Sequence, residues 1–77
     1  MGRDRFLRNV MVAIGNSGDP ALAEAARARL EDASPLVRAM AAWALSRLLP
    51  REEFERLRAE REPTEPDPDV RVEWRAG

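Results

Sequence analysis

Two short breaks interrupt the apolar part of this 77-residue chain, and they limit its possible folds more than any other feature. The breaks GNSGDP and EDASP each separate stretches in which apolar residues recur at helical spacing. Each break ends in a helix-capping residue followed by proline, Asp19-Pro20 in the first and Ser34-Pro35 in the second. Helices joined by so few residues pack as antiparallel neighbours. The sequence therefore predicts stacked helical hairpins.

The apolar spacing predicts three helices and favours a fourth. The first runs over about residues 4–14 and is expected to end at Gly15, and the second follows Asp19. The third runs from Ser34 until Pro50, and its wide apolar arc predicts a central position. The next stretch, PREEFERLRAER, has glutamates near its start and arginines near its end, which favours a short capping helix.

The end of the chain is expected to differ from the helical part. The stretch EPTEPDPD contains three prolines and four acids within eight residues, a composition that disfavours a helix. Val70, Val72 and Trp74 alternate, as they do in an extended segment with one buried side. The predicted organisation is a helical domain over residues 1–61 and an extended, Pro- and acid-rich tail over residues 62–77, with Trp74 folded onto the helices.

The residue inventory excludes most kinds of catalysis. The chain has no cysteine, histidine, tyrosine or lysine, so it offers no thiolate ligand and no base to activate a serine. Three tail carboxylates lie close together, Glu65, Asp67 and Asp69, but the tail lacks the glycine and the terminal glutamate of a calcium loop. We therefore expect a solvated acidic tail, and a chain that by itself has no catalytic residue, cofactor or metal.

Charge is distributed unevenly along the chain. Residues 1–51 contain eight arginines and five acids, a net charge of +3, whereas residues 52–77 contain five arginines and nine acids, a net charge of −4. No apolar run approaches the roughly 20 residues of a membrane span, and no signal peptide is recognisable. The expected setting is cytoplasmic, without a membrane partner.

Shifting the chain by 30 residues aligns two of the predicted helices. RDRFLRNVMVAI falls on ASPLVRAMAAWA, so that Leu7-Arg8 matches Val37-Arg38. A hydrophobic pair followed by arginine at a fixed period is typical of a repeat array. Residues 19–49 then form one complete unit, and the first helix is the second half of a preceding unit.

The complete unit, GDPALAEAARARLEDASPLVRAMAAWALSRL, resembles a HEAT-like repeat of the short type. In such repeats the arginine of the Val-Arg pair commonly braces a neighbouring turn through its aspartate. The resemblance therefore implies that Arg8 and Arg38 bind Asp19 or Asp32. The predicted fold class is all-α, with three to four helices in antiparallel HEAT-like hairpins followed by the extended acidic tail.

Three stretches, GRDRFLRNVMVAIGNSGDP, SPLVRAMAAWAL and DPDVRVEW, together resemble the C-terminal end of epoxyqueuosine reductase. This family of oxidoreductases carries out the last step of queuosine biosynthesis on tRNA. The resemblance implies a non-catalytic domain that helps to bind tRNA near the anticodon loop and packs on the catalytic region of its own chain. It also implies that the cobalamin and the iron–sulfur clusters of the family are held by that other region, N-terminal to the repeats.

The residues expected to meet RNA lie on the first and third helices. At 100° per residue, Arg5, Arg8 and Asn9 share one face of the first helix, and Arg38 lies on the equivalent face of the third. Guanidinium forks match phosphate oxygens. Arg3 and Arg5 match no bracing role, which makes them the stronger candidates, whereas Asn9 fits a carbonyl cap and an RNA contact equally well.

A protein-interaction scaffold without RNA binding is the alternative. The helix left without a first half-repeat would expose apolar surface, which predicts self-association of the isolated chain. Trp43, at the edge of the apolar arc, is expected to fill the core and not to stack on a base.

Overall fold

The computed structural model describes residues 2–76, and these residues are helical apart from short connections, with no strand among them. The five α-helices are α1 (Gly2–Ser17), α2 (Ala23–Ala28), α3 (Pro35–Leu48), α4 (Arg51–Arg61) and α5 (Pro68–Ala76). Three single 3₁₀ turns lie at Pro20–Leu22, Arg29–Glu31 and Glu62–Thr64. The predicted all-α class is confirmed, with one helix more than the sequence indicated.

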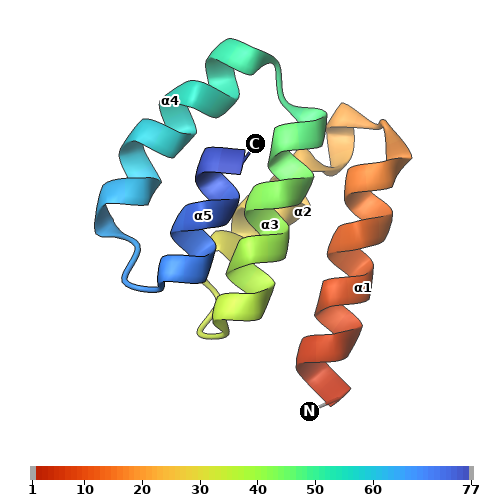
Figure 1. Ribbon diagram of the computed structural model, residues 1–77. Coiled ribbons are helices and arrows are strands. Elements are labelled where there is room, and N and C mark those ends of the chain that lie inside the picture. The colour runs from red at the N-terminus through yellow and green to blue at the C-terminus, as the bar shows by residue number, and fades with distance from the viewer. Residues whose placement is uncertain (1, 77) are drawn as a thin grey trace.

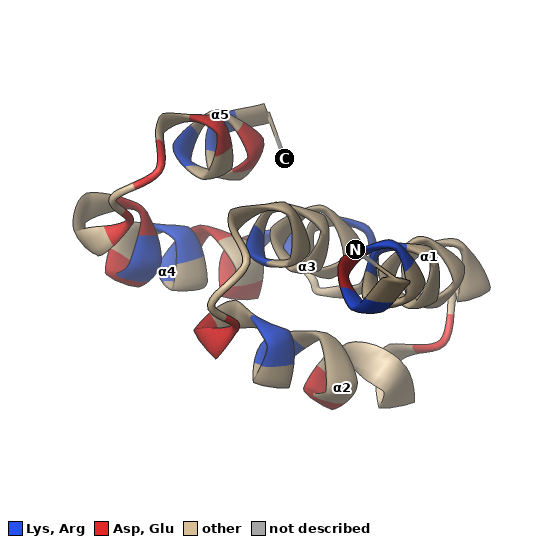
Figure 2. Cartoon of the chain, turned by 90° about the horizontal axis from the view of Figure 1, so that it is seen from below, with Lys and Arg blue, Asp and Glu red and all other residues tan. Residues whose placement is uncertain are grey.

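The helices form two layers around α3 (Figure 1). Helices α1, α3 and α5 lie side by side in the same general direction, and α3 is the central one, in contact with both neighbours. Seen along the helices, these three form a curved row, and α2 and α4 lie on its other side, where they lead back from one helix of the row towards the next (Figure 2). The predicted central position of the third helix is confirmed.

Small residues allow the neighbours of α3 to approach it closely. Ala41, Ala42, Ala44 and Leu45 are fully buried and lie within little more than one turn of this helix, on different sides of it. Because alanine adds little bulk and costs little side-chain entropy, a helix with alanines on several faces can contact helices on several sides. The thin core of this short chain is therefore built around one helix.

The predicted start of the third helix is confirmed, and Asp19 and Pro20 begin the second helical segment as predicted, although its first turn, Pro20–Leu22, is 3₁₀ and α2 itself begins at Ala23. The side chain of Asp19 accepts a hydrogen bond from the backbone N–H of Ala21 at 3.0 Å, and Pro20 follows it. The hydroxyl of Ser34 accepts from the N–H of Val37 at 3.4 Å. Both caps satisfy backbone donors that have no partner within the first helical turn.

Gly15 does not end the first helix, as the sequence suggested. Helix α1 continues to Ser17, and the turn is made by Gly18, whose φ of 69° is in the left-handed region that favours glycine. Gly15 is buried inside α1, where the ring of Trp43 lies against it. A Cβ at position 15 would lie 2.4 Å from a ring carbon, so glycine is needed here for a close helix contact.

The expectation of an extended tail is wrong for residues 68–76, which form α5. The prolines do not prevent this helix because Pro68 occupies its first turn, where a missing N–H costs nothing. Asp67 caps it and accepts hydrogen bonds from the N–H groups of Asp69 at 2.8 Å and Val70 at 3.3 Å. The helical spacing of Val70 and Trp74 buries both side chains.

Trp74 folds onto the helices, as predicted. It is 1% exposed, and its ring centroid lies 5.5 Å from that of Phe54 in α4. Val72, which an extended segment would place on the same side as Val70 and Trp74, is 56% exposed. Helix α5 thus completes the core between α3 and α4.

No helix within residues 2–76 combines the length and the apolar character that crossing a membrane requires.

Candidate nucleic-acid interface

The turn before α3 is organised around the carboxylate of Asp32. Arg3, from the start of α1, donates two hydrogen bonds to it, at 2.5 and 3.2 Å, and the backbone N–H of Ser34 donates a third at 2.9 Å. The side chain of Asp32 is buried, so this paired geometry compensates for its desolvation. Arg3 is therefore a structural brace, which corrects the expectation that it has no such role.

The turn before α5 repeats the same arrangement around Glu65. Arg38, from α3, donates two hydrogen bonds to this carboxylate, at 2.9 and 3.0 Å, and the N–H of Asp67 donates a third at 3.0 Å. In both turns, an arginine of the preceding helix of the row binds the turn carboxylate. We call this pair of interactions the arginine ladder.

Arg38 braces a turn, as the HEAT-like resemblance implied, but its partners differ from the predicted ones. It donates to the backbone carbonyls of Asp32 and Ala33, at 2.8 and 3.1 Å, and to Glu65. Arg8 was expected to bind Asp19 or Asp32, but within residues 2–76 its side chain has no hydrogen bond or ion pair. Arg3, at the start of α1, binds Asp32 instead.

A third copy of the motif that aligns α1 with α3 is not found by shifting the chain by 30 residues. Residues SPLVR before and within α3 match DPDVR before and within α5, but at a spacing of 33 residues instead of 30. Arg71 donates to the carbonyl of Glu65 at 2.7 Å, six residues back, as Arg38 does to the carbonyl of Asp32. A search at variable spacing would have identified this copy and, with it, the helix α5.

The hydrogen bonds of the arginine ladder lower the pKa values of both carboxyl groups. For Asp32, the bond from Arg3 is the largest cause of the lowered pKa, and the N–H of Ser34 adds to it. For Glu65, burial acts to raise the pKa, but the bonds from Arg38 and from the N–H of Asp67 outweigh burial. Both groups are consequently ionised in the folded chain at neutral pH.

These shifts predict acid destabilisation with a defined sign. A carboxyl whose pKa is lower in the folded chain stabilises the fold above its unfolded-state pKa, about 4, and this stabilisation is lost as the pH falls through the folded-state pKa. We expect a urea midpoint that changes little from pH 7 to 5 and falls below about pH 4. In Asp32→Asn the midpoint should be lower at pH 7 and decline less with acid. Asp69→Asn, at an exposed position on α5, is the control, and an equal acid response in all three proteins would contradict the assignment.

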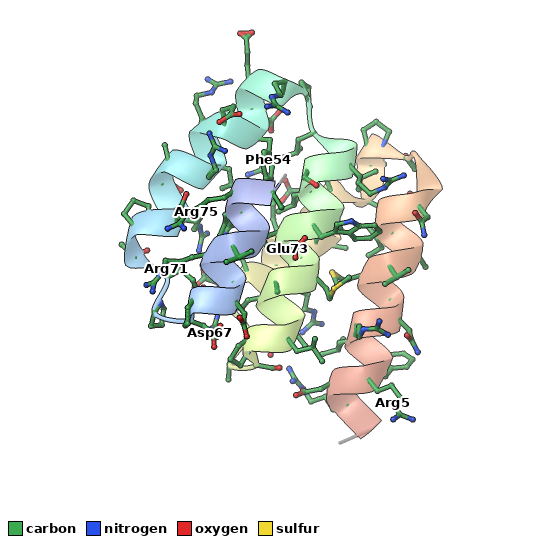
Figure 3. The ribbon with its side chains drawn as sticks, viewed as in Figure 1. Arg5, Phe54, Asp67, Arg71, Glu73 and Arg75 are labelled. Atoms are coloured by element: carbon green, nitrogen blue, oxygen red, sulfur yellow. The ribbon has the colours of Figure 1, made fainter. Side chains whose placement is uncertain are left out.

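Among residues 2–76, the arginines without a hydrogen bond or ion pair to a described residue are Arg5, Arg8 and Arg56. Arg5 and Arg8 lie three residues apart on α1, and Arg56 lies on α4. Figure 3 shows the side chain of Arg5 directed away from the helices at the N-terminal end of α1. Since paired guanidinium groups are already bound, Arg5 and Arg8 form the one pair of neighbouring unbound cations among the described residues, whereas Arg56 lies by itself on α4.

Arg5 and Arg8 line a concavity between the starts of α1 and α3. Its volume is about 500 Å³, and its other lining residues are Gly2, Asp4 and Leu36. Asn9 is exposed on the same helix and has no hydrogen bond among the described residues. Of the five predicted RNA-contacting residues, the structure thus leaves Arg5, Arg8 and Asn9 available, whereas Arg3 and Arg38 are bound in the arginine ladder.

Trp43 packs partly buried against the core, as predicted. The guanidinium of Arg47 lies 5.4 Å above its ring, and the Nε–H of Arg47 donates to the carbonyl of Gly15 at 3.3 Å. These contacts hold the ring between α1 and α3. The described structure therefore uses Trp43 for a helix contact.

Comparisons of this chain with protein-family models, with curated proteins and with solved structures found no significant match.

Proposed function

We propose that this chain is a non-catalytic, HEAT-like repeat module that binds RNA through Arg5 and Arg8. The observation that carries this proposal is that Arg5 and Arg8 lie close together on α1, exposed and without a hydrogen bond or ion pair to a described residue. Apart from Arg56 on α4, the other arginines are bound to carboxylates or carbonyls. A free guanidinium pays no cost of breaking an ion pair when it meets a phosphate. The edge of the molecule formed by the first turns of α1 is thus the surface best suited to RNA.

The proposed HEAT-like character is supported by the two layers, the motif copies at α1, α3 and α5, and the arginine ladder that joins them. Its proposed biological setting follows the resemblance to epoxyqueuosine reductase. There the module would help to hold tRNA near the anticodon loop in the cytoplasm, next to a catalytic region that carries the cofactors. In this setting the module itself contributes no cofactor ligand and no catalytic residue.

Acidic residues of the C-terminal part do not compete for the proposed site in the described structure. Glu65 is bound to Arg38, and Glu62 to Arg75 at 2.6 Å. The acidic charge of this part is therefore partly neutralised locally, at α3 and α5. This arrangement supports the proposal that Arg5 and Arg8 are left for an external anion.

The test is a tRNA titration at low salt, followed by fluorescence anisotropy. We expect weak, salt-sensitive binding that Arg5→Ala/Arg8→Ala reduces at least about fivefold, with a salt dependence shallower by about 1 to 1.5 in d log K/d log[salt]. Arg56→Ala/Arg75→Ala is the matched control, because it removes the same charge from α4 and α5. A comparison of an anticodon stem-loop with an unrelated stem-loop of equal length tests the proposed tRNA setting.

Equal binding by the wild-type chain and the Arg5→Ala/Arg8→Ala variant would remove these residues from the site. If the chain binds no RNA but self-associates in sedimentation experiments, the scaffold alternative gains support. Phe6 is then the candidate contact residue of the self-associated form, since its ring on α1 is 65% exposed.

A further inference from the structure

The concavity beside Arg5 and Arg8 combines three chemical features within one small space. Leu36, which is 45% exposed, supplies an apolar wall, and the absence of a side chain at Gly2 leaves room beside it. The two guanidinium groups supply positive charge, and Asp4 supplies a carboxylate. The volume, about 500 Å³, is within the usual range for a site that takes one small ligand.

The carboxylate of Asp4 keeps acceptor capacity after its internal hydrogen bonds are counted. One oxygen accepts from the hydroxyl of Ser34 at 2.9 Å, and the other from Arg3 at 3.2 Å. A carboxylate offers about four acceptor positions, and the side chain of Asp4 is 44% exposed. Asp4 is thus anchored by α3 in a fixed place and can still accept hydrogen bonds from a ligand.

We propose that this concavity binds one unpaired guanine nucleotide of a single-stranded RNA segment, an inference that rests on the proposed RNA-binding function. The phosphate groups lie on Arg5 and Arg8, and one face of the base lies on Leu36. The Watson–Crick edge of the base donates to Asp4. A base within a duplex has this edge paired, so the site selects loops and single strands over helical stems.

Guanine is the base that suits a carboxylate acceptor. Its N1–H and its N2 amino group are adjacent donors, and together they match the two oxygens of one carboxylate. Adenine and cytosine place a ring-nitrogen acceptor next to the amino group, and uracil has one N–H between two carbonyls. Each of these bases would bring a lone pair towards the negatively charged oxygens of Asp4.

The experiment uses 5′-labelled RNA nonamers of eight uridines around a central guanosine, adenosine, cytidine, uridine or abasic site. Affinity for the chain is measured by fluorescence anisotropy at low salt. We expect the guanosine nonamer to bind about tenfold more tightly than the abasic one, and several-fold more tightly than the other three. A duplex form of the guanosine nonamer should lose this advantage.

Two variants test the assigned contacts. Asp4→Asn keeps an acceptor for Ser34 but places an amide donor towards guanine, so the preference for guanosine should fall to within about twofold. Leu36→Ala should weaken binding of all base-containing nonamers while leaving the abasic one unchanged. Asp69→Asn and Val72→Ala, at exposed positions on α5, are the matched controls, and circular dichroism checks that each variant is folded.

The outcomes separate this inference from the proposed function. If all nonamers bind equally, and Arg5→Ala/Arg8→Ala still weakens them, the nucleotide site is overturned while RNA binding through the arginines stands. A guanosine preference that survives in Asp4→Asn also overturns the site as assigned. If the chain binds neither tRNA nor any nonamer, both proposals fail.

Discussion

Replacing Trp74 with alanine is expected to lower the free energy of unfolding by about 3–5 kcal/mol, which is enough to unfold much of so small a protein. The indole is 1% exposed and packs between α3 and α4, where it contacts the ring of Phe54. Its removal leaves a cavity at the place where α5 meets the remaining helices. Urea denaturation followed by far-ultraviolet circular dichroism measures the effect.

The matched control is Val72→Ala, on the exposed side of the same helix. It should change the free energy of unfolding by no more than about 0.5 kcal/mol. A similar small effect of Trp74→Ala would contradict the packed position of α5 and favour the extended tail that the sequence suggested.

Replacing Gly15 with leucine is expected to cost about 3 kcal/mol of stability, despite the better helix propensity of leucine. A Cβ at this position would lie 2.4 Å from one atom of the Trp43 ring and 3.0 Å from two others, so α1 and α3 would have to separate. The measurement is again the free energy of unfolding in urea. Gly2→Leu is the control on the same helix, because a Cβ at Gly2 has nothing within 4 Å.

A double-mutant cycle tests whether contact with the Trp43 ring causes the loss of stability in Gly15→Leu. If the cost of Gly15→Leu comes from the ring of Trp43, it should decrease by at least about 1 kcal/mol in a Trp43→Ala background. An unchanged cost in that background would show that another contact requires the glycine.

Local signals in the sequence predicted the helix starts correctly, and tertiary contacts explain where prediction failed. Asp19-Pro20 and Ser34-Pro35 act within a single turn, so their capping role is visible in four or five residues. A rule based on neighbouring residues cannot tell whether Gly15 ends a helix or leaves room for a ring from another helix. Only the position of Trp43 in three dimensions distinguishes the two.

The C-terminal part was mispredicted because alternation and helical spacing overlap in a short segment. Val70 and Trp74 fit a period of two as well as a spacing of four, and Val72 is the residue that separates the two patterns. Prolines disfavour the interior of a helix, but DP before an apolar stretch is the same start signal as at Asp19. Comparison with that earlier signal would have predicted α5.

The sequence predicts the helical face of the candidate site but not which of its arginines are bound. The helical face shared by Arg5, Arg8 and Asn9 follows from periodicity alone. Which arginines are bound depends on side chains that reach across about 30 residues of sequence. Arg3 pairs with Asp32 because α1 lies beside α3, and no local sequence pattern predicts this contact.

The arginine ladder also makes the helical hairpins depend on one another when the chain unfolds. Each turn carboxylate has its hydrogen-bonded cation on the preceding helix of the row, so detaching α1 leaves Asp32 with only the more distant Arg29, 3.7 Å away, and disordering α3 leaves Glu65 without Arg38. A buried carboxylate that loses its hydrogen-bonded cation is destabilising, so partly unfolded forms that keep only one hairpin are disfavoured. Opening of one unit thereby destabilises the next, which favours unfolding of the array as a single cooperative unit.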